Sequence, residues 1–390
     1  MKSIALLVQN LNNGGAERTA SNLALILAKT YDVHLILFDG TKCSYPIAGT
    51  LHDLQLPPRS GTVGKFFNLL RRIRRVRSIK KQAHITCSIS FLDGANLVNI
   101  YSRCEDRIVT SIRNQMSLSS GDKSGKQKQI LKRTARRSDC IVSLSDGVRQ
   151  DLIENYGIDG KKIVTIYNPC DGKLLMELAQ RNQQAAAQMS VNSVTTMGRL
   201  TEQKGQWHLI RAFQKVVAVI PDATLYILGE GPLLDRLQAL AKALRLQERI
   251  VFLGYVEAPH AFIFKSRMFV FPSLFEGLGN VLLEAMACGT PCIASDCLSG
   301  PREILAPGTS VRQLLPCYEQ APYGILTSVC GPGQFNAEEP LTEQEIQLAD
   351  AMLLLFQDDA ARQQYHEKGL ERIQAFSPEA IATMWTNVIE

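Results

Sequence analysis

Residues 275–289 read FEGLGNVLLEAMACG and hold two glutamates, Glu276 and Glu284, on either side of a glycine-rich turn. The second half of the stretch consists of short, apolar helix formers and ends in glycine, the residue favoured just past a helix end. The apolar run at 268–271, closed by proline and serine, is typical of a short buried strand. The stretch therefore predicts a strand, a tight loop and a helix, with Glu276 in the loop and Glu284 one turn into the helix.

This arrangement suits an anionic ligand that carries hydroxyl groups. The first N–H groups of a helix lack partners, and the helix dipole adds positive charge there. Gly277 and Gly279 let the backbone approach a bound phosphate closely. Carboxylates on either side can accept hydrogen bonds from sugar hydroxyls. The alternative is that Glu276 lies beside a helix start without a ligand and that Glu284 is solvated.

Length and composition indicate a two-domain soluble enzyme. A chain of 390 residues is too long for one ordinary core. No apolar run reaches the roughly 18 residues that span a bilayer, and the first apolar segment is too short for a signal peptide. The ten cysteines form no C-x-x-C pair and have no histidine at zinc spacing. We therefore expect reduced, buried thiols in a cytoplasmic protein.

The net charge of +6 conceals a strong asymmetry between the two halves of the chain. Residues 1–165 hold 26 Lys and Arg against 13 Asp and Glu, whereas the remainder holds 17 against 24. The first part is basic and the second acidic, so we expect the two parts to face different partners.

The first half of the chain has the pattern of a parallel α/β sheet. A continuous apolar run, typical of a strand buried on both faces, falls at 4–8, and further strands are predicted at 33–38, 85–91, 107–112, 141–145 and 163–169. Gly14 and Gly15 precede the first helical pattern, as in nucleotide-binding folds, although the G-x-G-x-x-G fingerprint is absent. A plain tight turn is the alternative. Arg113 follows a strand, where open α/β sheets keep site residues.

A basic helix is predicted over 65–81, which contains eight Lys and Arg and no acidic residue. Phe66, Leu69, Leu70, Ile73 and Val76 fall at helical spacing, and arginines occupy the other face. Such a helix can lie on an anionic membrane surface. It can also pack its apolar face on the sheet as an ordinary surface helix. Seven more basic residues fall between Lys123 and Arg137, but no nucleic-acid-binding motif accompanies the charge.

A second series of strands begins after a polar segment at 169–192, which we interpret as a connection. Its apolar runs fall at 193–197, 223–228, 250–253, 268–271 and 291–295. We therefore predict two doubly wound parallel-sheet domains, 1–168 and 193–375, facing a cleft. A final helix, at 376–390, follows the second domain. The stretch at 307–341 is longer than a typical connection, and its role stays open.

A pair of cations, Arg199 and Lys204, follows the first strand of the second series in the motif GRLTEQKG. Either one alone would be an ordinary surface charge. Together in a strand-to-helix loop they can hold a diphosphate, the arginine through paired N–H bonds and the lysine as a point charge.

These motifs together resemble the retaining glycosyltransferases of family four, which have the GT-B fold. The matching stretches run in the family's order: GGAER at 14–18, GRL…QKG at 198–205, GEGP at 229–232, FLG at 252–254 and the two glutamates of 276–284. The segment SGPREIL at 299–305 is similar to a variant found in bacterial surface-polysaccharide enzymes of that family.

The resemblance implies a nucleotide-sugar, UDP-linked by family habit, in the second domain. Catalytic roles then fall on Glu276, which would contact the transferred sugar, and on Arg199 and Lys204, which would neutralise the diphosphate. Glu284 would hold the ribose. The other implied donor contacts are Gly14, Gly15, Tyr255, Val256, Leu278, Gly279, Asn280, Val281 and Leu282. Arg113 corresponds to a residue that contacts sugar or acceptor in relatives, and the helix at 376–390 would cross back to the first domain.

The resemblance also implies same-face attack by the acceptor hydroxyl, with retention and without a metal or other cofactor. The expected function is transfer of a hexose or N-acetylhexosamine to a polyprenyl-diphosphate-linked saccharide, as in O-antigen or lipopolysaccharide biosynthesis, by a peripheral protein on the cytoplasmic face of the membrane. A nucleotide-sugar epimerase of the same fold, or a non-enzymatic protein that binds nucleotide-sugar or nucleic acid, is the alternative.

Overall fold

The computed structural model describes residues 1–12, 15–113, 117, 125–312, 314–331 and 335–390. The chain divides into two compact units, each described here by itself. The first consists of Met1–Pro169 and Pro378–Glu390, and the second of Cys170–Ser377. Gly14 and Lys123, named above, lie outside the described residues.

The first unit is built on a seven-stranded sheet in the order β3-β2-β1-β4-β5-β6-β7, in which every neighbouring pair is parallel. Its strands are β1 Ser3–Val8, β2 Asp32–Leu37, β3 Thr50–Asp53, β4 Cys87–Phe91, β5 Arg107–Ile112, β6 Cys140–Ser143 and β7 Ile163–Thr165. Its helices are α1 Gly15–Leu27, α2 Thr62–Gln82, α3 Leu92–Tyr101, α4 Gly125–Arg137, α5 Asp146–Glu154, the short η1 Gly160–Lys162 and α14 Pro378–Ile389. The predicted first doubly wound domain is confirmed.

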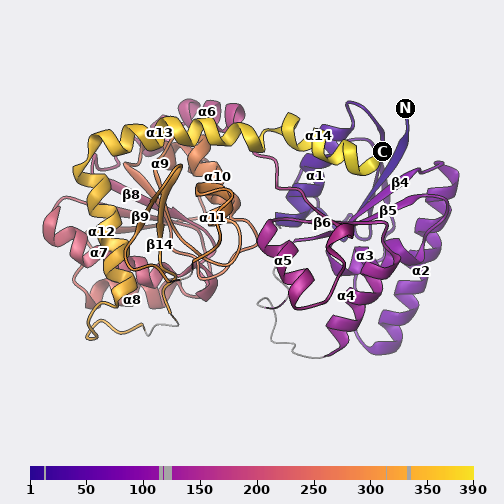
Figure 1. The fold of residues 1–390 in the computed structure, drawn as a ribbon, viewed down its shortest axis with the longest axis horizontal. Helices are drawn as coiled ribbons and strands as arrows, with labels where there is room; N and C mark the ends of the chain where they lie inside the picture. The colour runs from indigo at the N-terminus through magenta and orange to yellow at the C-terminus, as the bar shows by residue number, and fades with distance from the viewer. Residues whose placement is uncertain (13–14, 114–116, 118–124, 313, 332–334) are drawn as a thin grey trace. The chain divides into compact units, whose positions relative to one another are not determined.

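Helices cover both faces of this sheet, which explains why β1 is apolar at every position from Ile4 to Val8. Ile4, Leu6 and Val8 of β1 pack into a core with α1 and α14, whereas Ala5 and Leu7 point to the opposite core with α2 and α3. Every one of these side chains is fully buried. Figure 1 shows α1 and α14 side by side, so the last helix of the chain completes the core of the first unit.

Helix α2 only partly follows the predicted apolar face. Val76 is fully buried, and Leu69 and Ile73 pack against the core. Phe66, expected on the packed face, is instead 56% exposed, as is its neighbour Phe67. The reason is that the apolar cluster under α2 is met by the later turns of the helix, whereas its first turns extend beyond it.

The second unit is built on a seven-stranded sheet in the order β10-β9-β8-β11-β12-β14-β13. Its strands are β8 Ser193–Met197, β9 Thr224–Leu228, β10 Ile250–Gly254, β11 Met268–Phe271, β12 Cys292–Ser295, β13 Glu319–Ala321 and β14 Gly324–Thr327. Its helices are α6 Gly172–Arg181, α7 Gln206–Val219, α8 Leu234–Ala243, α9 Pro259–Lys265, α10 Asn280–Ala287, α11 Pro301–Leu305, α12 Glu343–Gln357 and α13 Asp359–Ile373, with the short η2 Gln183–Ala186, η3 Glu202–Lys204 and η4 Gln374–Phe376.

Two segments of the second unit are more structured than their sequences indicate. Residues 169–192, interpreted as a connection, form α6 and η2, which pack on α9. The long stretch at 307–341 contains β13 and β14, a hairpin that continues the sheet beyond β12 and adds its one antiparallel pair. Strands of three and four residues are too short to produce a periodic pattern, which is why the sequence reads as a loop there.

Among the described residues no helix is both long and apolar enough to cross a membrane.

Candidate donor site at the carboxyl edge of the second sheet

The predicted site residues of the second unit gather at one edge of its sheet. The chain passes from β8 outward through β9 to β10, then returns to place β11 on the other side of β8. This reversal makes the β8–β11 boundary the topological switch point, where open α/β sheets leave a crevice between diverging loops. Lys204 lies in the loop after β8 and Glu276 in the loop after β11.

Lys204 and Glu276 form an ion pair across this switch point, with Lys204 Nζ donating to Glu276 Oε1. The lysine side chain is 18% exposed and the glutamate side chain 8% exposed. Lys204 Nζ also lies 5.3 Å from the centroid of the Phe271 ring, a cation–π distance. Two of the three residues predicted to carry the chemistry, Lys204 and Glu276, therefore neutralise one another where little water reaches them.

The loops that carry this pair are held together by hydrogen bonds to backbone carbonyl groups. Leu274 N donates to Gln203 O at 2.8 Å, and the Gln203 side chain returns a 2.9 Å bond to Phe275 O. Ser299, in the loop after β12, donates from its hydroxyl to Glu276 O. Three loops from three neighbouring strands thus fix the backbone on both sides of Glu276.

Two glycines make this close approach possible. Gly205 has φ +62°, and a Cβ there would lie 2.2 Å from Pro272 O. Gly300 has φ +95°, and a Cβ there would lie 1.9 Å from Leu278 O. Both positions combine a left-handed backbone with direct contact to the glutamate loop, so only glycine fits.

Glu284 lies in α10 as predicted and is buried beside α9. Its Oε2 lies 3.2 Å from His260 Nε2. The helix begins after Gly279, which has φ +92°, so Leu278 and Gly279 form the turn and Asn280, Val281 and Leu282 form the first helical turn. This places the N-terminus of an eight-residue helix next to Glu276.

The remaining predicted donor contacts are accessible. The Arg199 side chain is exposed and has no hydrogen bond or ion pair to any described residue. Tyr255 is 79% exposed and Val256 half-buried, in the loop that follows β10. Beneath Arg199 the backbone is packed against the next loop, because a Cβ on Gly229 would lie 2.1 Å from Gly198 O. Arg199 is therefore a free guanidinium on a fixed backbone.

The first unit holds its own predicted site residue, Arg113, at the carboxyl edge of its sheet. Its guanidinium donates to Asn168 Oδ1 and, at 3.2 Å, to Thr19 Oγ1, and it lies 5.9 Å from the centroid of the Phe91 ring. No carboxylate among the described residues pairs with it. Burial lowers the pKa of Arg113 to about 9, which still leaves a cation at pH 7. Gly15 starts α1 in the same unit.

Two family models match the chain. Residues 13–173 match the model described as "Glycosyltransferase Family 4", and residues 179–319 match the model described as "Glycosyl transferases group 1". The two matches follow one another and together span most of the sequence. The chain belongs to the family 4 glycosyltransferases.

Two curated relatives illustrate the similarity. An uncharacterized glycosyltransferase of Methanocaldococcus jannaschii is 43% identical over 197 residues, which make up 50% of this chain and 48% of that protein. The N-acetylgalactosamine-N,N'-diacetylbacillosaminyl-diphospho-undecaprenol 4-alpha-N-acetylgalactosaminyltransferase of Campylobacter jejuni is 28% identical over 390 residues, 98% of each chain. The chain thus spans about half the length of the first relative and nearly all of the second.

A solved structure confirms the predicted fold. Anabaena HepE in complex with UDP and glucose superimposes with a TM-score of 0.76 at 18% identity, covering 100% of this chain and 99% of that one. The architecture predicted from the sequence, two doubly wound parallel-sheet domains of GT-B type, is therefore the architecture of this family 4 glycosyltransferase.

Several residues that build the sites of this glycosyltransferase give no signal in its sequence. His260, the partner of Glu284, occurs in a helix with no recognisable motif. Thr19 and Asn168, which hold Arg113, lie 94 and 55 residues from it in the sequence. Ser299, by contrast, belongs to the SGPREIL segment that the sequence analysis singled out.

The two cysteines next to the site, Cys288 and Cys297, have raised thiol pKa values, whereas a nucleophilic cysteine has a lowered one. Burial raises the pKa of the Cys297 thiol well above its usual value, and burial together with the Glu284 carboxylate raises the pKa of Cys288 to about 12. Both thiols therefore stay protonated and serve as small buried side chains.

Proposed function

We propose that this protein is a retaining glycosyltransferase that moves a hexose or N-acetylhexosamine from a UDP-sugar to a lipid-linked saccharide. One observation carries the proposal: the buried Lys204–Glu276 pair at the switch point of the second sheet, beside the free guanidinium of Arg199 and a helix N-terminus. This edge of the sheet therefore holds two cations that can bind a diphosphate, Arg199 and Lys204. It also holds a carboxylate that can accept hydrogen bonds from a sugar, Glu276.

Each side chain has a proposed task in the transfer. Arg199 and Lys204 neutralise the diphosphate as it leaves, which is the largest electrostatic demand of the reaction. Glu276, released from Lys204, accepts hydrogen bonds from the transferred sugar. Glu284 accepts them from the ribose, with its carboxylate oriented by His260.

The backbone and the loop after β10 complete the proposed donor site. The turn at 278–279 and the first N–H groups of α10, at 280–282, face the β-phosphate and the sugar. Tyr255 and Val256 line the base, for which the exposed tyrosine offers a stacking surface. In the first unit, Gly15 stands at a helix start suited to a phosphate.

The proposed chemistry needs no protein nucleophile and no metal ion. The bond between the anomeric carbon and the leaving phosphate oxygen breaks while the acceptor oxygen bonds to the same face of that carbon. The acceptor proton passes to the leaving phosphate oxygen, and the products are UDP and the lengthened saccharide. The two cations supply the positive charge that a metal ion would otherwise provide.

Arg113 is the proposed contact to the acceptor or to the transferred sugar. It is a buried cation whose partners among the described residues are all uncharged: Asn168, Thr19 and, at 3.4 Å, Ser111. Because an unpaired buried charge is costly, an anionic or hydroxyl-rich ligand at this place would gain a strong hydrogen-bond donor.

A lipid-linked acceptor is supported by the name of the Campylobacter jejuni relative, which refers to a saccharide on diphospho-undecaprenol. The exposed side chains of α2 support the expected membrane surface. Val63, Phe66 and Phe67 are exposed beside Lys65, which is the mixture of apolar and basic groups that binds an anionic interface. We therefore propose a peripheral location on the cytoplasmic face of the membrane and a role in surface-glycan assembly, O-antigen or lipopolysaccharide.

The test of the transfer is a product assay with radiolabelled UDP-N-acetylgalactosamine and UDP-hexoses against a diphospho-undecaprenol-linked saccharide. Label should enter the lipid fraction only when acceptor is present, and EDTA should leave the rate unchanged. Donor conversion without acceptor would indicate an epimerase instead. Binding of donor without any turnover would indicate a binding protein.

The membrane proposal is tested on side chains that the fold does not need. Arg72 and Arg75 donate to the carbonyls of Leu56 and Leu54, so replacing them would disturb the packing. Replacing Phe66 and Phe67 by Ser should release the protein from anionic vesicles while donor binding is unchanged. Vesicle binding that survives this change would exclude the amino-terminal part of α2 as the membrane contact.

A further inference from the structure

A basic pocket lies at the amino-terminal edge of the first sheet, the edge opposite Arg113. It has a volume of ≈ 680 Å³ and is open to solvent. Five basic residues line it: Arg77 of α2, Arg103 from the turn after α3, Arg136 and Arg137 from the end of α4, and Lys162 from η1. The one acidic residue among its described lining is Asp139, so five cations face one carboxylate, a balance of +4.

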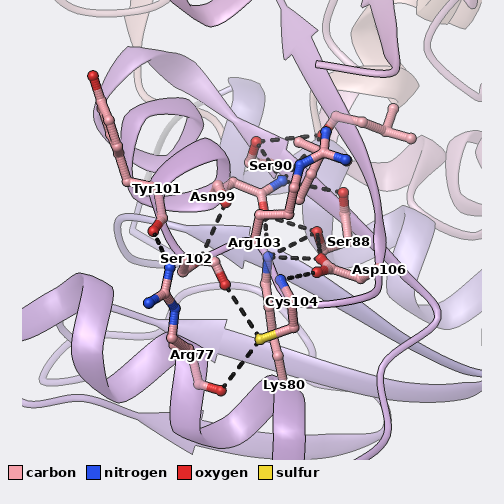
Figure 2. Close-up of polar contacts among 12 residues, drawn as sticks. Arg77, Lys80, Ser88, Ser90, Asn99, Tyr101, Ser102, Arg103, Cys104 and Asp106 are labelled. Atoms are coloured by element: carbon pink, nitrogen blue, oxygen red, sulfur yellow. Dashed lines mark hydrogen bonds and ion pairs between the residues drawn. The ribbon is translucent and has the colours of Figure 1, made fainter. Parts of the chain in front are cut away.

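A buried ion pair fixes the turn that brings Arg103 and Cys104 to this pocket. Lys80 Nζ lies 2.7 Å from Asp106 Oδ2, and both side chains are fully buried. Figure 2 shows the lysine reaching Ser88 and Asn99 as well, at 3.0 and 2.7 Å. The other carboxylate oxygen of Asp106 accepts a 2.8 Å bond from Cys104 N. The turn at 102–106 is therefore clamped to α2 and carries Arg103 into a defined position.

Two of the guanidinium groups around the pocket donate to backbone carbonyls, and a third lies over an aromatic ring. Arg103 donates to Arg137 O at 2.7 Å and to Asp139 Oδ2 at 2.9 Å, and Arg77 donates to Tyr101 O at 3.1 Å. Arg137 lies 4.7 Å from the centroid of the Tyr101 ring. Each arginine has more N–H donors than these contacts use, and the spare donors belong to side chains whose positions are already set.

The positive balance exceeds what the helix ends around the pocket neutralise. Helices α3 and α4 end here, at Tyr101 and Arg137, and each carboxyl end contributes roughly half a negative charge, which leaves a balance of about +3. Capping of helix ends therefore explains some of the cations but not all of them. Several fixed guanidinium groups around one open pocket suit a compact anion with many acceptor oxygens.

We propose that this pocket binds a phosphate group, either free or carried by the headgroup of an anionic lipid. The site is separate from the donor site, and its existence does not depend on the proposed transfer reaction. The exposed basic face of α2, with Arg74 and Lys81, runs beside it. If the phosphate belongs to a lipid, the pocket adds a headgroup contact to the proposed membrane surface.

Cys104 provides a local reporter of occupancy. The thiol is half-buried in the pocket, with Sγ 3.8 Å from Arg77 O and 3.6 Å from Ser102 O. The rate of its alkylation by iodoacetamide can be followed by peptide mass spectrometry in the full-length protein without nucleotide, since UDP itself carries phosphate groups. Cys43 and Cys317 are exposed and serve as internal references.

Inorganic phosphate should slow alkylation of Cys104 relative to chloride at equal ionic strength and leave Cys43 and Cys317 unchanged. Arg103→Gln and Arg137→Gln should each raise the phosphate concentration needed for half-protection by about tenfold, the loss of roughly one charge-assisted hydrogen bond. Arg107→Gln is the matched control, because Arg107 is exposed at the same edge but does not line the pocket. Thermal unfolding of each variant checks that the fold is retained.

Vesicles separate the two sources of phosphate. Protection by phosphatidylglycerol-containing vesicles, beyond that given by pure phosphatidylcholine, would assign the pocket to a lipid headgroup, and protection by inorganic phosphate alone would assign it to a free anion. Absence of protection by either probe, or an equal loss in Arg107→Gln and Arg103→Gln, would overturn the site. A failure of glycosyl transfer in the parallel product assay would leave this readout untouched.

Discussion

Replacing Lys204 by methionine separates the two roles that the structure gives this residue. Methionine replaces the lysine by an unbranched apolar side chain one atom shorter, so it removes the charged Nζ that lies over the Phe271 ring. Glu276, only 8% exposed, is then left without its described cation. We expect lower stability of the second unit and, independently, a large loss of glycosyl transfer.

The magnitudes follow from the burial of the pair. Removing one partner costs about 3–5 kcal/mol in a fully buried pair and about 0–1 kcal/mol in an exposed one. With side chains 18% and 8% exposed, this pair falls between, at about 2 kcal/mol. For a unit of this size that corresponds to a fall in Tm of roughly 4–8 °C. The loss of one cation from the leaving diphosphate should lower kcat by about 10²–10³.

The double variant Lys204→Met/Glu276→Gln distinguishes the two effects. It removes the orphaned carboxylate, so we expect at least half of the lost stability to return, whereas kcat should fall further. Differential scanning calorimetry and the lipid-acceptor assay measure the two quantities on the same samples. The reasoning is refuted if Lys204→Met keeps kcat within threefold of the wild type, or if the double variant is no more stable than the single one.

Three further outcomes follow from contacts elsewhere in the second unit. Glu284→Gln should weaken UDP affinity in calorimetric titration by about tenfold with little change in kcat, because a ribose anchor binds substrate and transition state alike. Gly300→Ala should lower the free energy of urea unfolding by more than 2 kcal/mol, whereas Gly308→Ala, equally left-handed at φ +78° but in open space, should lose about 1 kcal/mol. Burial disfavours the Glu345 carboxylate, but hydrogen bonds from its neighbours outweigh it and hold its pKa below the usual value. The stability that this ionised carboxylate contributes is therefore complete above pH 4.5 and is lost as the pH falls through the folded pKa. When the free energy of urea unfolding is measured against pH, Glu345→Gln should reduce its fall at acid pH. Replacing the exposed Glu343 by Gln should leave that fall unchanged.

The sequence predicts those features of the site that depend on local chemistry. Glu284 could be placed in a helix because apolar helix formers surround it, and Gly279 could be placed in a turn because of its neighbours. Lys204 and Glu276 are 72 residues apart, yet both follow strands that doubly wound topology makes neighbours. Their common location was therefore predictable, and their direct pairing was not.

Features that depend on packing between distant elements have no such signal. His260 reaches Glu284 only because α9 and α10 pack against one another, and neither helix shows this in its own pattern. Phe66 has the right spacing for a packed face but extends past the apolar cluster that would cover it. The hairpin of β13 and β14 is too short to show alternation, and it is stabilised as an extension of a sheet that begins far earlier in the chain.

The Lys204–Glu276 pair changes how the proposed donor site must work. The family resemblance assigns each residue to a different part of the donor, whereas in the structure the two residues form an ion pair with each other. In the proposed site without donor, Lys204 and Glu276 neutralise one another, and Arg199 is exposed and has no ion-pair partner among the described residues. In the proposed reaction, donor binding would exchange this ion pair for two new contacts, lysine to phosphate and glutamate to sugar. Both new contacts would be needed to offset the free energy of the broken ion pair. A donor with the wrong sugar would leave Glu276 without a partner and would therefore bind more weakly than the missing contact alone implies. In this proposal the pair couples recognition of the sugar to recognition of the diphosphate.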